Sequence, residues 1–153
     1  MFWASCLALA VAAPAPPVTL VRAARLIDGR GGAVIAPAAV RVEGEGVTAV
    51  AERLDAPAGA TVVDLGAATL LPGLIDLHTH LTDRQGMHWE EALVKTTPGE
   101  AAIWATHNAR LTLESGVTSC RDMGPTWPYV DVDLRNAIVN GVVPGPRLLR
   151  ACN

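Results

Sequence analysis

The residues after Leu71 alternate between strand-like and helical segments, and this alternation constrains the fold more than any other feature of the chain. Strands are predicted at 73–80, 117–121 and 147–151, and helices at 97–115 and 133–140. A loop of roughly sixteen residues separates the first strand from the first helix. Because strands that alternate with helices form parallel sheets, this part of the chain is predicted to be an α/β domain.

The helix predicted at 97–115 carries signals at both ends. Thr97 suits the N-cap, Pro98 the first helical position and Glu100 the third. Gly116 can adopt the left-handed conformation that ends a helix. Four residues recur at helical spacing, and we expect their face to pack against the core: Ile103, Trp104, His107 and Leu111. His107 is accordingly predicted to be a packed, structural histidine.

Residues 18–71 have a different pattern, which predicts a small, mostly antiparallel, β-sandwich-like subdomain. Five β-type segments can be recognised, at 18–21, 25–27, 39–43, 48–50 and 61–65. Turns rich in glycine separate them, including the glycines that follow Asp28. Because these glycines lack the G-x-x-x-x-G-K-[ST] pattern and no helical segment follows, we interpret them as a turn and not as a phosphate-binding loop.

The composition is that of a folded protein without a nucleic-acid surface. Half of the 153 residues are hydrophobic, whereas disordered chains are poor in apolar residues. The net charge is −3, and the 12 basic residues are scattered and form no stripe, so we expect neither a nucleic-acid partner nor an anionic-membrane surface. The three cysteines, Cys6, Cys120 and Cys152, indicate neither a zinc knuckle nor a disulfide framework.

The first fifteen residues differ from the rest and are predicted to be a signal peptide or a disordered leader. They contain no charge, an apolar run at 7–13 and small residues at 10–12, which resemble the apolar region and cleavage site of an export signal. The basic start of such signals is missing, and the run is shorter than the ~20 residues needed to span a bilayer. We expect a periplasmic or secreted location if this segment is a signal peptide, and a cytoplasmic one otherwise.

Two histidines at the end of the first α/β strand are the main candidates for function. His78 and His80 are two residues apart, so both side chains, and that of Asp76, point to the same side of the strand. In parallel α/β folds, active sites form at the carboxyl ends of the strands. Two neutral imidazoles on one face can bind a divalent ion such as zinc, although an isolated His-x-His pair is also compatible with two ordinary surface histidines.

The longer segment 71–80, with the sequence LPGLIDLHTH, resembles the first barrel strand of the metal-dependent amidohydrolase superfamily. Segment 116–124, GVTSCRDMG, is similar to the second strand, and segment 141–147 to the entry of the third. The resemblance covers nearly all of residues 18–151 and favours the imidazolonepropionase-like and Xaa-Pro dipeptidase-like branch. It implies an incomplete (β/α)8 TIM-type barrel in residues 72–153, with two βα units and a third strand.

The resemblance also implies the chemistry of the site. In the family, histidines at the positions of His78 and His80 bind a divalent metal, usually zinc, and the complete site holds one or two ions. The metal activates the water that hydrolyses a C–N bond. Asp76 and Asp122 are expected at most to orient neighbouring groups through hydrogen bonds. No catalytic residue is assigned, because the family's general base lies on the eighth strand.

The chain is therefore predicted to be the N-terminal fragment of an amidohydrolase that acts on an amide-type bond of a small molecule or dipeptide. Because a (β/α)8 barrel takes about 250 residues, the other ligands are expected from a missing C-terminal portion or an oligomer partner. Lys95 and His88, in the loop before the first helix, are not expected to replace them. The alternative is a non-catalytic remnant or a partner-dependent interaction module that binds metal weakly.

Overall fold

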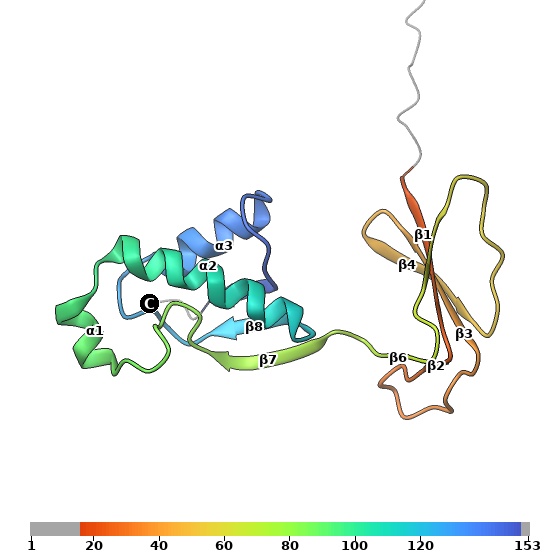
Figure 1. Ribbon diagram of the computed structural model, residues 1–153, viewed down its shortest axis with the longest axis horizontal. Coiled ribbons are helices and arrows are strands. Elements are labelled where there is room, and N and C mark those ends of the chain that lie inside the picture. Colours follow the sequence, from red (N-terminus) through yellow and green to blue (C-terminus); the bar gives the residue numbers. More distant parts are fainter. Residues whose placement is uncertain (1–15, 151–153) are drawn as a thin grey trace, which may run out of the picture. The chain divides into compact units, whose positions relative to one another are not determined.

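The computed structural model describes residues 16–150, so the predicted leader and the cysteines at positions 6 and 152 lie outside the described residues. The chain divides into two compact units between Pro72 and Gly73 (Figure 1). Each unit has its own sheets and its own core. Within residues 16–150, no helix combines the length and the apolar character needed to cross a lipid bilayer.

The first unit contains a four-stranded sheet of order β4-β3-β1-β5 and a two-stranded sheet of β2 and β6. The strands are β1 (Val18–Ala23), β2 (Arg25–Leu26), β3 (Ala38–Glu43), β4 (Gly46–Ala51), β5 (Thr61–Asp64) and β6 (Thr69–Leu70). The pairs β1-β3 and β3-β4 are antiparallel, as predicted. In contrast, β5 lies parallel to β1, and β6 lies parallel to β2. These parallel pairs join strands distant in sequence, so the turn signals between neighbouring strands do not predict them.

The core of the first unit is small and aliphatic. Leu26, Ala38 and Val40 are buried, and Val42 is partly buried against them. Because alternate residues of a strand point to the same face, the residues at 38, 40 and 42 give β3 one apolar face. This face packs against the partly buried side chains of Val21, Ile35 and Leu70.

The second unit contains a parallel sheet of order β7-β8-β9, with helices between its strands (Figure 1). The strands are β7 (Leu74–Thr79), β8 (Val117–Asp122) and β9 (Arg147–Arg150), and the helices are α1 (Trp89–Lys95), α2 (Pro98–Glu114) and α3 (Val130–Val139). The helix α2 packs on β8, and α3 packs on β9 and α2. The predicted strand–helix alternation is confirmed, although the described residues do not form a complete barrel.

Local signals determine where α2 begins and ends. The hydroxyl oxygen of Thr97 accepts a hydrogen bond from the Glu100 N–H group at 3.2 Å, as an N-cap residue does. Gly116, which has a φ of 94°, follows the end of the helix as predicted. The next helix, α3, begins at Val130 and not at the predicted residue 133.

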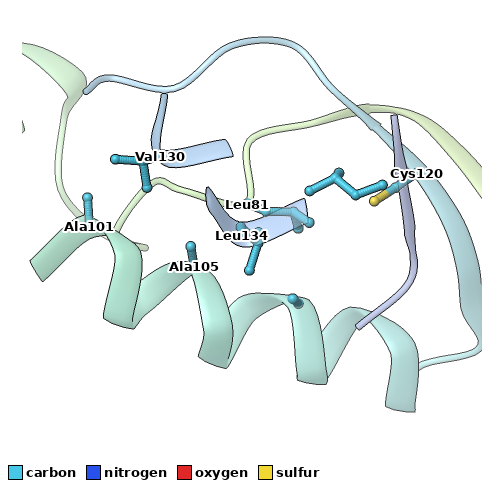
Figure 2. Packing of buried hydrophobic residues seen from close by; sticks show 8 residues of the cluster. Leu81, Ala101, Ala105, Cys120, Val130 and Leu134 are labelled. Atoms are coloured by element: carbon cyan, nitrogen blue, oxygen red, sulfur yellow. The ribbon is translucent and has the colours of Figure 1, made fainter. Parts of the chain in front are cut away.

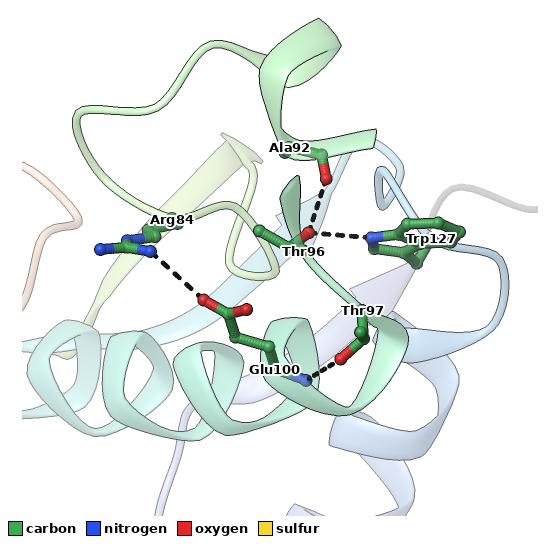
Figure 3. A network of polar contacts seen from close by, with 6 residues as sticks. All are labelled: Arg84, Ala92, Thr96, Thr97, Glu100 and Trp127. Carbon is green, nitrogen blue, oxygen red and sulfur yellow. Dashed lines mark hydrogen bonds and ion pairs between the residues drawn. The ribbon is translucent and has the colours of Figure 1, made fainter. Parts of the chain in front are cut away.

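The helix α1 lies in the segment that was predicted to be a loop. It has only seven residues, and an ion pair between Glu91 and Lys95 joins successive turns. At its end, the Thr96 hydroxyl donates to the Ala92 carbonyl at 2.7 Å and accepts from Trp127 Nε1 at 3.1 Å (Figure 3). Contact with a distant tryptophan, which no local pattern reveals, therefore helps to hold this short helix.

The buried face of α2 differs from the predicted one. Ile103 is 72% exposed, Leu111 is 42% exposed, and His107 is exposed as well. The buried face is instead formed by Ala101, Ala105, Asn108 and Ala109. Its three alanines belong to one core cluster with Leu81, Cys120, Val130, Leu134 and Leu148, which is drawn in Figure 2. The prediction was wrong because both faces have the same i, i+4, i+8 spacing. Close packing of α2 on the sheet favours the face with small side chains, although the other face is more hydrophobic.

Candidate metal site at the end of strand β7

His78 lies in β7 and His80 directly follows its last residue. The centroids of the two imidazole rings are 5.4 Å apart, and the ring planes are inclined by 60°. Both residues are exposed, so a ligand can approach them. The structure thus brings the two predicted ligands together on one side of the strand, which agrees with the two-residue period of β structure.

The position of β7 depends on a close approach to β8. A Cβ atom at position 73 would lie 2.7 Å from the Cβ atom of Thr118 and would overlap the rest of that side chain. Such contacts are well inside van der Waals distance, so only glycine permits this spacing. Gly73, which precedes β7, therefore helps to bring the strand that carries the histidines against its neighbour.

A backbone carbonyl orients the His80 ring. Nδ1 of His80 lies 3.3 Å from the carbonyl oxygen of Gly124. Because a carbonyl oxygen can only accept a hydrogen bond, Nδ1 carries the proton. The lone pair of the neutral ring is then on Nε2, which is the atom left for a metal. Gly124 has a φ of 122°, a backbone conformation that residues other than glycine rarely adopt.

Asp122, at the end of β8, connects this turn to the segment after His80. Its side chain is fully buried, and its two oxygens accept hydrogen bonds from the N–H groups of Leu81 at 2.7 Å and Gly124 at 3.1 Å. Burial raises the pKa of Asp122, while these two hydrogen bonds and the nearby His80 oppose the rise. Asp122 thus holds the backbone of the residue that follows His80 and of the glycine whose carbonyl oxygen meets the His80 ring, and not the ring nitrogens.

Asp76 has a more local contact. Its Oδ1 accepts a hydrogen bond from the backbone N–H group of His78 at 3.0 Å. The pairing of β7 with β8 is irregular between Asp76 and Thr79, and this hydrogen bond lies in that irregular stretch. Asp76 therefore stabilises the backbone at the first histidine.

Asn108 is the residue of this region that sequence reasoning missed. It is 9% exposed, and its Nδ2 atom donates to the carbonyl oxygens of Leu81 and Asp83, both at 2.9 Å. A signal was present in the sequence, since an asparagine interrupts the alanine face of α2 that otherwise packs on the core. A buried polar group on such a face needs partners, and here they come from the segment after His80.

The other polar residues of this segment have partners away from the histidine pair. His88 precedes α1, and its Nδ1 donates to Glu90 at 2.8 Å with the ring largely exposed. Lys95 pairs with Glu91, and this pairing lowers the pKa of Glu91. Arg84 pairs with Glu100 at 3.2 Å (Figure 3). None of these groups is brought to the end of β7 by the contacts described.

Residues 69–152 match the family model described as "Amidohydrolase family". The chain belongs to this family. It is 43% identical over 72 residues to an allantoinase of Streptomyces avermitilis. This match covers 46% of this chain and 16% of the relative. It is 34% identical over 113 residues to a dihydroorotase of Streptomyces coelicolor, covering 74% of this chain and 22% of the relative.

Solved structures agree with this assignment. A Xaa-Pro dipeptidase with methionine bound in its active site matches this chain with a TM-score of 0.73 and 28% identity, over 88% of this chain and 33% of the other. An ochratoxinase of A. niger matches with a TM-score of 0.72 and 25% identity, over 88% and 31%. The chain thus spans about a fifth of these curated relatives and a third of these solved structures.

The residues at the end of β7 are chemically compatible with one side of a divalent-metal site. Imidazole nitrogen is a donor that zinc and related ions prefer, and His80 presents Nε2 for this purpose. Within residues 16–150, no three side chains of the types His, Cys, Asp and Glu are grouped closely enough to hold a metal. Because catalytic zinc sites take three protein ligands, His78 and His80 would be too few to form such a site without further donors.

Proposed function

We propose that the chain contributes His78 and His80 to the zinc site of a hydrolase that cleaves an amide-type C–N bond in a small molecule or dipeptide. The observation that carries this proposal is the pair of adjacent rings, one of them with its Nδ1 atom 3.3 Å from the Gly124 carbonyl oxygen. Membership of the amidohydrolase family supports the reaction class. The likeness to a solved Xaa-Pro dipeptidase supports a substrate as small as a dipeptide.

The roles of the residues follow from their contacts. Bound zinc would supply an activated water molecule and polarise the scissile carbonyl group. His80 would bind the ion through Nε2, because its Nδ1 is held by the Gly124 carbonyl. Asp122 would keep that carbonyl in place through the Gly124 N–H group, and Asp76 would hold the backbone of His78.

The second unit would form the first part of a (β/α)8 barrel. In the described sheet, β7 and β9 each have one neighbouring strand, so each has an edge at which another strand can pair. The side chains at the β7 edge are apolar and open, with Leu74 57%, Ile75 68% and Leu77 64% exposed. Further strands, from a C-terminal portion or an oligomer partner, would cover this surface and supply the other ligands.

Isothermal titration with zinc of the full-length gene product tests the metal site. The His78→Ala/His80→Ala double variant is expected to bind zinc more than about 100-fold more weakly than the parent, because even loss of a group that only supports a zinc ligand costs 10–100-fold. The matched control is His88→Ala/His107→Ala, which removes the other two histidines of the chain, both exposed. Equal zinc affinity of the first variant and the parent would end the proposal.

A further inference from the structure

The residue that follows His80 is held from both sides by buried side chains. The Leu81 N–H group donates to Asp122 at 2.7 Å, and the Leu81 carbonyl oxygen accepts from Asn108 at 2.9 Å. Asn108 donates a second hydrogen bond to the carbonyl oxygen of Asp83, also at 2.9 Å. Asn108 on α2 and Asp122 at the end of β8 thus both form hydrogen bonds to the backbone of residues 81–83.

The chemistry of these contacts accounts for an asparagine at position 108. A side-chain amide nitrogen has two N–H donors, and here each meets one backbone carbonyl oxygen. Leu81 and Asn108 are both buried, so water does not readily replace a lost donor. An alanine would match the rest of this face of α2 but would leave both carbonyl groups without this partner.

His80 itself is held less firmly than its neighbour in the chain. Its ring is exposed and has one hydrogen bond in the described structure, the 3.3 Å contact with Gly124. Its backbone carbonyl oxygen accepts a hydrogen bond from the Asp83 N–H group at 3.2 Å, so the backbone of His80 is tied to the segment that Asn108 holds.

We propose that Asn108 is a positioning residue for His80: by holding the carbonyl groups of Leu81 and Asp83, it fixes the backbone from which the histidine reaches the metal. This inference rests on the proposed function, because it assigns Asn108 a role toward a metal ligand. It adds a residue from the middle of a helix, 28 positions after His80, to a site otherwise built at strand ends.

Two measurements on the full-length gene product test the proposal. The first is hydrogen–deuterium exchange of the metal-free protein, read in peptides that cover residues 79–86. The second is the zinc dissociation constant. For Asn108→Ala we expect at least tenfold faster exchange in these peptides and zinc binding weakened about 10–100-fold, the range for groups that support a metal ligand.

A matched variant separates positioning from general stability. Ala105→Gly lies one turn earlier on the same buried face and destabilises the interior of α2, but it removes no hydrogen bond to Leu81 or Asp83. We expect it to leave zinc affinity within about twofold of the parent. If Ala105→Gly weakens zinc binding as much as Asn108→Ala, or if Asn108→Ala binds zinc like the parent, the proposal is overturned.

Other outcomes also decide the question. If Asn108→Ala does not fold, Asn108→Ser is measured instead, and parent-like exchange at residues 79–86 in that variant would contradict the proposal. If the His78→Ala/His80→Ala variant binds zinc like the parent, the proposed function fails. Hydrogen–deuterium exchange of the metal-free protein then still decides whether Asn108 anchors residues 79–86. Faster exchange confined to these peptides supports the anchor in either case.

Discussion

Asp122→Ala is expected to lower the free energy of unfolding by about 1–4 kcal/mol. The carboxylate is fully buried and accepts two backbone hydrogen bonds, from Leu81 at 2.7 Å and Gly124 at 3.1 Å. An alanine would leave the buried Leu81 N–H group without this partner, at a cost of about 1–3 kcal/mol, and the partly buried Gly124 N–H group at a smaller cost of up to about 1 kcal/mol. The loss would therefore be large for one substitution.

The chain offers a matched control for this experiment. Asp64 accepts a hydrogen bond from the N–H group of Gly66 at 2.8 Å, the same two-residue spacing that Asp122 has with Gly124. Asp64 and its partner are exposed, so water can replace the lost bond. Asp64→Ala is expected to cost less than about 1 kcal/mol.

Urea denaturation followed by circular dichroism measures both losses in the full-length gene product, through the midpoint and slope of each transition. Asp122→Asn keeps one acceptor oxygen and is expected to fall between the parent and Asp122→Ala. If Asp122→Ala costs no more than Asp64→Ala, burial does not amplify the two hydrogen bonds and the reasoning is wrong.

Four further predictions concern other parts of the chain. Gly73→Ala should lower stability by about 1–3 kcal/mol, because its Cβ would overlap Thr118, and an unchanged urea midpoint would contradict the close approach of β7 and β8. Cys120 should resist iodoacetamide until the protein is denatured, because it is buried and burial raises the pKa of its thiol; peptide mapping that finds it labelled in the native protein would disprove this. If the leader directs export, N-terminal sequencing of periplasmic protein should begin near Ala13, and recovery in the cytosol alone with an intact start would argue against export. The 153-residue polypeptide expressed alone should aggregate, because the described sheet has two open edges. It should also hydrolyse no amide or dipeptide substrate, because the described residues contain no group of three side chains that could hold a metal. A monodisperse monomer with zinc-dependent turnover would refute this prediction.

Local chemistry allowed several features to be predicted from the sequence. The ends of α2 depend on Thr97, Pro98 and Gly116, each of which acts within a few residues of its own position. The shared side of His78 and His80 follows from the two-residue period of a strand. The strand–helix alternation of the second unit was predictable for the same reason, because hydrophobic periodicity is read over short windows.

Other features were decided by contacts between distant residues. The choice between two equally spaced faces of α2 depended on how closely that helix approaches the sheet, and not on which face is more hydrophobic. The parallel pairing of β5 with β1 joins segments about 40 residues apart. The contact between Trp127 and Thr96, which helps to hold α1, joins residues 31 positions apart.

For the candidate site, the sequence by itself determined that two imidazoles lie together at the end of a strand. Only the tertiary structure decided what holds them, since the partners of Leu81 lie on α2 and β8, 27 and 41 positions away. The physical reason is that buried backbone groups must find hydrogen-bond partners wherever folding places them. A period or a cap depends on neighbours in the chain, whereas the role of Asn108 exists only once α2 packs beside the segment that follows His80.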